Sequence, residues 1–521
     1  MATDINLCMM RFKDRAERIE PSQIIETFVD VGPLLNILES ENNQLVYGRR
    51  GVGKTHALLY LGDKRTSAGD FVVYVDCRNL GSNISIYTDP TLSRPERATR
   101  LLIDVCSQIH ESILDRVTDP AKDYDYSKVV PVLNDLLDGI GQIRILGDVQ
   151  KSESSAEKAA TGSKSGLVVA AKPSASFEGT ETTARESSFS RKQTGRVTEW
   201  IDFGNLGRVF SDLSKSLDGK RIWLLIDEWS AIPHDLQPHL ADLLRRTVIV
   251  NAGLTVKIGA IEHRSNFMER SSTSDYIGLE IGSDITPAID LDDYLVFDRN
   301  SEKATEFFRG LIGKHIKAVS EELDVKLPED SAAIIALAFT QENVFREFVI
   351  ATEGVPRDAL HILQRAATKA DNSLISLPVL KDAVLGYYQT DKYNSINGNE
   401  PLRLLLEWIR DEVIGGRRTR AFLLPVGTND PLIDELFDRR ALHILNRSMS
   451  AAHRPGERFV VYKLDYGCYV DLRATDKFPS GLLFANEEET DSLPEVPEDD
   501  ARSYRRAVLE LSDFYTSHPS E

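Results

Sequence analysis

The chain has 521 residues, 41% of them hydrophobic and 27% charged, which is the composition of a globular protein with room for about three domains. No apolar run approaches the roughly 20 residues that cross a bilayer, and the N-terminus lacks the basic-then-apolar order of a secretory signal. A net charge of −19 argues against a protein that holds DNA through many non-specific phosphate contacts, although basic clusters at 415–422 and 437–448 leave room for a local contact. Four scattered cysteines indicate neither a disulfide framework nor a zinc site and fit a reducing cytoplasm.

After an N-terminal segment (1–27), short apolar runs alternate with amphipathic stretches, and this pattern predicts an α/β core over 28–298. Strands are expected at 43–48 and 70–77, with a helix over 54–66 between them. Strand, loop, helix and strand at this spacing form a βαβ unit, which predicts a parallel sheet covered by helices.

Residues 151–198 interrupt this pattern with a low-complexity stretch rich in Ser, Ala, Gly, Thr and Lys. Such a composition is typical of a disordered or hairpin-like surface insertion, and the alternative is a mobile arm that contacts a partner or a neighbouring subunit. The α/β pattern resumes with buried strands at 221–230 and 254–265 and an amphipathic helix over 237–251. Only helices are predicted over 299–398, which indicates a helical lid.

A third unit is predicted over 399–475, with helices at 401–413 and 431–448. Asp465-Tyr466-Gly467 lies between two β-rich runs and predicts a hairpin turn. Helices followed by a hairpin are typical of a winged helix. The remaining residues, 476–521, form an acidic tail with a terminal helix.

Gly48 to Thr55 matches the pattern G-x-x-x-x-G-K-[ST] in full, between a predicted strand and a predicted helix. The glycines allow a nest of backbone N–H groups that surrounds an anion at the helix N-terminus. Lys54 is expected to reach the β- and γ-phosphates of a nucleotide, and the Thr55 hydroxyl to bind Mg²⁺. Arg49 and Arg50 are either solvated loop charges or contacts to phosphate or a neighbouring subunit. The predicted nucleotide-binding residues in this stretch are Gly48, Arg49, Arg50, Gly51, Val52, Gly53, Lys54, Thr55 and His56.

An acid pair, Asp227-Glu228, ends the buried run Ile222 to Ile226. In a nucleoside triphosphatase such a strand places one carboxylate near the metal and the next near the γ-phosphate. Asp227 is therefore expected to hold Mg²⁺ through water, and Glu228 to orient and polarise the attacking water. The glutamate indicates hydrolysis rather than binding alone.

The next predicted strand ends in Glu262-His263-Arg264, and one of these side chains is expected at the γ-phosphate, with Glu262 favoured by position. In the lid, Pro356 predicts a helix start that puts Arg357 in the first turn, where the helix dipole disfavours a cation. An unfavourable charge there suggests another purpose, and Arg357 is expected to point back at the nucleotide and sense its γ-phosphate.

These motifs together resemble an AAA+ ATPase: a Walker A loop, an Asp-Glu Walker B strand and Gly-x-Pro-Arg in a helical lid, followed by a winged-helix-like region. The most similar group is the origin-recognition and cell-division-control initiator clade, with the related STAND signalling NTPases. The resemblance implies that Lys54 and Thr55 bind phosphate and metal, that Asp227 and Glu228 form the Walker B pair, and that Arg357 is the second sensor. It also implies that Val31, Gly32 and Pro33 line the adenine base.

The sequence departs from this family in three respects. The Asn or Thr of a first sensor is not evident in residues 260–265 at the end of the strand, the low-complexity insertion is not a general initiator feature, and the net charge is acidic. The arginine that such proteins insert into a neighbouring site has three candidates, Arg245, Arg246 and Arg264.

The sequence thus predicts an ATP-binding and ATP-hydrolysing switch that uses Mg²⁺, forms a nucleotide-dependent homo-oligomer, has no membrane partner, and engages DNA or a protein through its winged helix. One alternative is a DNA-binding protein with structural ATP, in which a helix around 437–448 presents Arg439, Arg440 and Arg447 to a groove. Another is a STAND-like sensor or defence NTPase that acts through a separate effector chain.

Overall fold

The computed structural model describes most of the chain, including all the predicted strands and helices of the core and lid. The described residues are 2–13, 15, 20–30, 32–81, 92–120, 124–146, 149–152, 190–193, 196–270, 275–294, 301–417, 419, 421–451, 454–473 and 505–518. Val31, most of the low-complexity insertion and most of the acidic tail lie outside them. Within these ranges, none of the helices combines the length and apolar character that a bilayer crossing requires.

The centre of the molecule is a five-stranded parallel sheet with the strand order β11-β1-β8-β7-β2. The strands are β1 (Gln44–Tyr47), β2 (Phe71–Asp76), β7 (Ile222–Asp227), β8 (Leu254–Ala260) and β11 (Thr286–Asp290). Strands β7 and β8 are buried on both faces, and their sequences are apolar over almost their whole length. Strands of this kind lie in the interior of a parallel sheet. The predicted α/β fold with a parallel P-loop-type sheet is confirmed; the short edge strand β11, which contains a proline, was not predicted.

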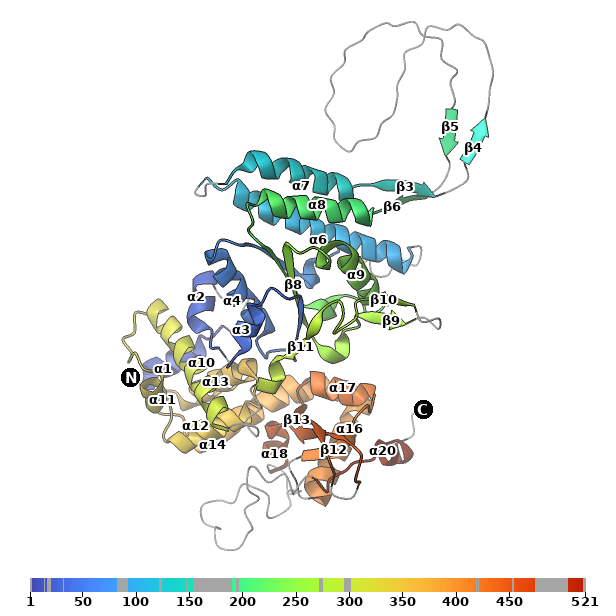
Figure 1. The fold of residues 1–521 in the computed structure, drawn as a ribbon. Coiled ribbons are helices and arrows are strands. Elements are labelled where there is room, and N and C mark those ends of the chain that lie inside the picture. Colours follow the sequence, from blue (N-terminus) through green and yellow to red (C-terminus); the bar gives the residue numbers. More distant parts are fainter. Residues whose placement is uncertain are drawn as a thin grey trace, which may run out of the picture.

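Helices cover both faces of this sheet (Figure 1). On one face, α3 (Leu34–Leu38) and α4 (Lys54–Ser67) pack against side chains that include Trp223 and Leu225. Leu224 and Ile226 of the same strand point to the other face. The helices on that face are α6 (Arg94–Val117), α7 (Tyr126–Ile140), α8 (Phe203–Ser216) and α9 (Gln237–Leu244).

Short antiparallel strands lie at the two ends of the low-complexity insertion. β3 (Ile143–Leu146) pairs with β6 (Arg196–Glu199), and β4 (Val149–Ser152) pairs with β5 (Ser190–Gln193). The ends of the insertion are therefore hairpin-like, and its middle, residues 153–189, lies outside the described residues. A second small pair, β9 (Met268–Arg270) and β10 (Tyr276–Gly278), follows β8.

The lid is a helical unit that lies beside the phosphate loop. It contains α10 (Ser301–Glu322), α11 (Ser331–Ala338), α12 (Glu342–Ala351), α13 (Pro356–Ala370) and α14 (Leu377–Tyr387). Its core also contains α1 (Ala2–Met10), which buries Ile5, Cys8 and Met9 among the lid helices. The N-terminal segment is therefore part of the lid, while α2 (Pro21–Thr27) leads from it to the ATPase core.

The C-terminal domain pairs helices with the three-stranded antiparallel sheet β12-β14-β13. The strands are β12 (Ala421–Pro425), β13 (Leu442–Met449) and β14 (Phe459–Leu464), and the helices are α15 (Asn394–Asn397), α16 (Glu400–Arg410), α17 (Pro431–Asp438), α18 (Tyr466–Arg473) and α20 (Leu511–Ser517). Helix α16, strand β12, helix α17 and the β13–β14 hairpin follow one another, which is in keeping with a winged-helix-like domain.

Two predictions in this domain are wrong. The helix expected over 431–448 ends at Asp438, because Arg440 adopts a left-handed conformation (φ 61°) that stops it, and the apolar residues that follow form β13. The hairpin turn expected at Asp465 is instead the start of α18, where the Asp465 carboxylate accepts a 3.0 Å hydrogen bond from the Gly467 amide. The hairpin of this domain is β13–β14.

Candidate nucleotide-binding site

The phosphate loop joins the end of β1 to the start of α4, as the motif predicted. Gly51 and Gly53 have φ angles of 88° and 106°, which other residues rarely adopt. Gly51 also allows a close approach, because a Cβ atom there would lie 2.8 Å from the Cβ of Arg357 in the lid. Helix α4 begins at Lys54, directly after this glycine-rich turn.

Two side chains of this first turn face the acid pair across the sheet edge. The Thr55 hydroxyl donates a 2.6 Å hydrogen bond to the Asp227 carboxylate. Lys54 is buried, and its ammonium donates to the carbonyl oxygens of Gly48 (2.7 Å) and Arg49 (3.1 Å). Burial lowers the pKa of Lys54, while the negative charges of Glu228 and Asp227 oppose that shift. The loop thus holds a buried lysine amine beside two acids, and an anion bound near it would favour its charged form.

Asp227 ends β7 and is fully buried, with its carboxylate fixed from several sides. Besides Thr55, it accepts hydrogen bonds from the Tyr74 hydroxyl (2.8 Å) and the Glu228 amide (2.8 Å). Gly259 of the neighbouring strand makes room for it, since a Cβ there would lie 2.7 Å from the carboxylate. Tyr74 and Gly259 were not predicted, because their role depends on strand neighbours rather than on a motif.

Glu228 follows in a left-handed conformation with a φ of 53°, which is unusual for a residue with a side chain. This backbone turn directs the carboxylate into the cavity that the phosphate loop also lines. A local strain of about 1–3 kcal/mol is typical of such positions and is common at functional sites.

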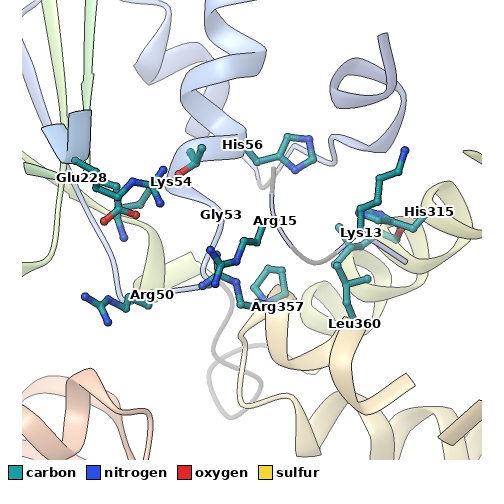
Figure 2. A pocket seen from close by; sticks show the side chains of 15 residues that line it. Lys13, Arg15, Arg50, Gly53, Lys54, His56, Glu228, His315, Arg357 and Leu360 are labelled. Atoms are coloured by element: carbon teal, nitrogen blue, oxygen red, sulfur yellow. The ribbon is translucent and has the colours of Figure 1, made fainter. Parts of the chain in front are cut away.

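A cavity of about 290 Å³ lies between the phosphate loop, the acid pair and the lid. Figure 2 shows Lys54 and Glu228 at one end of it and His315 and Leu360 at the opposite end. Among the described residues that line the cavity, Glu228 is the one carboxylate. The lysine and arginine residues in this described part of the lining are Lys13, Arg15, Arg50, Lys54, Arg78 and Arg357. So strong an excess of positive charge around a small cavity favours a polyanionic ligand.

Arg357 comes from the lid, in the first turn of α13, and lines the cavity from the side opposite the sheet. Its backbone N–H donates a 3.1 Å hydrogen bond to the Gly51 carbonyl, so the lid contacts the phosphate loop directly. The sequence placed Arg357 at the nucleotide, and the structure brings it to the same cavity as Lys54 and Glu228. Lys13, Arg15 and Arg78 join them without belonging to any motif that could have identified them.

The end of the cavity away from the acid pair combines Lys13 with imidazole rings and apolar side chains (Figure 2). His56 donates from Nε2 to the Ile24 carbonyl (2.9 Å), and burial lowers its pKa. His315 lies on α10, and burial lowers its pKa to about 4, so it is neutral at physiological pH. Neutral rings beside Leu311 and Leu360 suit a flat organic group better than a phosphate.

Several predicted residues do not line this cavity. Gly32 and Pro33 precede α3 and are absent from its walls, and Val31 lies outside the described residues. Glu262 forms an ion pair with Arg447 (3.0 Å) of the C-terminal domain. The expected γ-phosphate contact from Glu262 is therefore not supported, because its carboxylate is directed to another domain.

The other candidates near the strand ends are also engaged elsewhere. His263 pairs with Asp434 (3.3 Å) and Arg264 with Asp438, both on α17. Arg245 and Arg246 share the Asp242 carboxylate at 2.6 Å each. These contacts explain why polar residues follow β8 and α9 without contributing to the cavity.

Arg49 and Arg50 differ from each other although they are neighbours. Arg50 is exposed and lines the cavity, whereas the Arg49 side chain is 3% exposed and points away from it. The Arg49 guanidinium contacts Asp292 and His443 within this same chain. The prediction that Arg49 contacts phosphate is thus not supported by its position.

The donor set fits a magnesium nucleotide. The Thr55 hydroxyl and the Asp227 carboxylate provide two oxygen atoms 2.6 Å apart, and oxygen ligands of this kind are those that Mg²⁺ prefers. Protein sites of this type use few side-chain ligands and complete the coordination with water and phosphate oxygens. Among the described residues, no cluster of three or more His, Cys, Asp or Glu side chains offers a metal site independent of a nucleotide.

Comparisons with known proteins agree with the motifs. Residues 12–62, which contain α2, α3, β1 and the phosphate loop, match the model of the ORC-CDC6-like family. A comparison with curated proteins gave no match. Among solved structures, the Orc1 protein of Aeropyrum pernix in complex with DNA is similar with 13% identity and a TM-score of 0.30, over 91% of this chain and 97% of that one. Residues 12–62 resemble the ORC-CDC6-like family, as the motifs predicted, and this match lies at the phosphate loop and the segment before it.

Proposed function

We propose that this chain is an AAA+ switch protein that binds and hydrolyses ATP between its P-loop core and its lid. The observation that carries the proposal is the cavity in which Lys54, Glu228 and Arg357 meet from three separate elements. The loop provides N–H donors and a lysine for phosphate, the strand provides acids for metal and water, and the lid provides a cation. A protein that only binds a nucleotide, without hydrolysing it, does not need Glu228.

Each residue then has a distinct task. Lys54 exchanges its hydrogen bonds to loop carbonyls for phosphate oxygens, because ionised acceptors form stronger hydrogen bonds than neutral ones. Thr55 and Asp227 hold Mg²⁺, which when bound neutralises developing negative charge on the phosphates. Glu228 orients the attacking water and accepts its proton. Arg357 contacts the γ-phosphate and links the position of the lid to whether that phosphate is present.

Two variants test the proposal with a fluorescent ATP analogue and a phosphate-release assay. Lys54→Ala is expected to abolish or severely weaken nucleotide binding. Glu228→Gln is expected to bind ATP with near wild-type affinity and to turn it over very slowly. Wild-type turnover by Glu228→Gln would remove the proposed role of this carboxylate, and unaltered binding by Lys54→Ala would remove the site.

The switch acts on a partner, or within an assembly, that the C-terminal domain contacts. The two alternatives for this partner are DNA and another protein. A mass measurement of the purified protein with and without ATP and DNA tests the DNA alternative. Nucleotide-driven assembly without DNA binding argues against DNA and favours a protein partner, which includes the separate effector of a STAND-like sensor.

A further inference from the structure

The Arg49 side chain of the phosphate loop is buried in the C-terminal domain. Its Nε donates a 2.8 Å hydrogen bond to Asp292, and its NH1 group lies 2.6 Å from His443 Nδ1. NH1 also donates to the Leu442 carbonyl (3.3 Å), and the guanidinium stacks 4.8 Å above the Phe437 ring. Nothing in the loop motif requires this arginine, and its partners Leu442 and His443 lie almost 400 positions away in the sequence.

His443 is neutral and has one defined tautomer. Its Nε2 donates a 3.0 Å hydrogen bond to the Asp465 carboxylate, which leaves Nδ1 to accept from Arg49. Burial and the neighbouring charge of Arg49 lower the pKa of His443. The ring therefore acts as a fixed acceptor for the loop arginine rather than as a second cation.

The contact continues as a buried network through three parts of the chain. Asp465 accepts from Lys392 (2.6 Å), and Lys392 also pairs with Asp358 (2.8 Å) of the lid helix α13. Asp358 pairs with Arg440 (3.3 Å), whose NH1 returns to the phosphate loop by donating to the Arg50 carbonyl (3.2 Å). The network thus connects Arg49 with Arg50 through the C-terminal domain and the lid. It includes Asp358, the residue next to Arg357.

Three consecutive loop residues are held from outside the loop as a result. The Arg49 amide donates to Asp292 (2.8 Å), the Arg50 carbonyl accepts from Arg440, and the Gly51 carbonyl accepts from the Arg357 amide. The nest of N–H groups that binds phosphate is therefore shaped by Asp292, by the C-terminal domain and by the lid. A loop that is already in its binding shape loses less entropy when the ligand arrives.

We propose that Arg49 and His443 are positioning residues through which the docked C-terminal domain preorganises the phosphate loop, so that docking and nucleotide binding strengthen each other. Asp465 fixes the tautomer in which the His443 ring accepts from Arg49. The inference rests on the proposed ATP site and adds to it a reciprocal coupling between two parts of the chain. Because coupling free energies are reciprocal, a domain that improves nucleotide binding is itself held more firmly by the nucleotide.

Two substitutions at one position separate the contact from simple packing. His443→Asn places a side-chain carbonyl where Nδ1 accepts from Arg49, whereas His443→Gln places an amide N–H where Nε2 donates to Asp465. We expect the dissociation constant of a fluorescent ATP analogue to stay close to wild type in His443→Asn and to rise about tenfold in His443→Gln, the usual effect of losing a hydrogen bond to a charged group. Thermal unfolding curves establish that both variants are folded at the assay temperature.

Further variants keep the test decisive. Arg49→Lys, which keeps the charge but cannot reach Asp292 and His443 together, is expected to weaken binding like His443→Gln. The matched control is Arg439→Ala. Arg439 is the C-cap residue of α17 and pairs with Glu435 of the same helix, and the variant without this pair is expected to bind nucleotide normally. As the reciprocal readout, the nucleotide is expected to slow amide hydrogen exchange in Leu442–Met449 of the wild type and of His443→Asn, but not of His443→Gln.

The outcomes also distinguish the two proposals. Equal affinities in wild type, His443→Asn and His443→Gln, or tighter binding in His443→Gln, would overturn the positioning role while Lys54→Ala still loses binding. Normal binding by Lys54→Ala would overturn the ATP site itself.

Discussion

The Thr55 hydroxyl donates a 2.6 Å hydrogen bond to the Asp227 carboxylate and so joins the first turn of α4 to the end of β7, 172 residues away. The contact exists because β1 and β7 are parallel members of one sheet whose carboxyl ends lie at the same edge. Ligands of open α/β sheets bind at this edge, where loops and helix N-termini meet. The two oxygens are thus placed for a shared cation.

Replacing either oxygen is expected to remove the effect of Mg²⁺ on nucleotide binding. In the wild type, chelation of Mg²⁺ should weaken binding of the ATP analogue, because the phosphate charges lose their counter-ion. In Thr55→Ala and Asp227→Asn the affinity should be low and nearly the same with and without Mg²⁺. Tyr74→Phe, which removes the 2.8 Å hydrogen bond to Asp227 and leaves the Thr55 and Asp227 oxygens in place, is the control and should keep most of the Mg²⁺ dependence.

Gly51→Ala is expected to weaken nucleotide binding by displacing the lid. The added Cβ would lie 2.8 Å from the Arg357 Cβ, and the φ of 88° would also be strained. Gly427→Ala is a matched control, since Gly427 has the same φ of 88° with no heavy atom within 4 Å of the added group. Both variants should lose about 1 kcal/mol of stability in urea unfolding, but only Gly51→Ala should lose ATP affinity. Equal ATP affinities would contradict the close packing of lid and loop.

The phosphate loop, the acid pair and Arg357 could be predicted because each is a short pattern whose chemistry constrains neighbouring residues. The contacts of Arg49 could not, since its partner His443 is 394 residues away and nothing near either residue marks the pair. The local pattern also misled at 431–448, where an amphipathic start continued into an apolar run that pairs with β14. Helix and strand are hard to tell apart in such short runs, and the tertiary pairing decided the outcome.

The same limit explains the residues after β8. Their polar character at a strand end predicted a role at the γ-phosphate for Glu262, His263 or Arg264. In the structure these three side chains instead pair with residues of the C-terminal domain. A sequence shows that a polar group lies at the sheet edge but not which of two neighbouring surfaces it faces.

His315 is expected to make stability depend on pH below neutrality. Burial lowers its pKa to about 4, against roughly 6.5 in an unfolded chain, so between these values the unfolded state binds more protons. The free energy of unfolding should therefore fall as the pH drops through this window, by up to about 3 kcal/mol in all. Urea unfolding between pH 5 and 7 measures this, and His315→Gln should show a shallower slope. Parallel slopes in the two proteins would contradict a neutral His315.

The DNA alternative gives a final prediction, which depends on Arg447. This residue pairs with Asp290, Glu262 and Asp293 of the ATPase core, so a phosphate contact by Arg447 would compete with three carboxylates. Weakening the competitor with Glu262→Gln should raise DNA affinity, while Arg447→Ala should lower it and reduce the slope of log affinity against log salt by about one. Arg417→Ala, which removes an exposed cation of the basic cluster 415–422, tests whether this second cluster contributes to the same contact. A flat salt response in the wild type would instead favour a protein partner, because an interface without phosphate neutralisation releases few counter-ions.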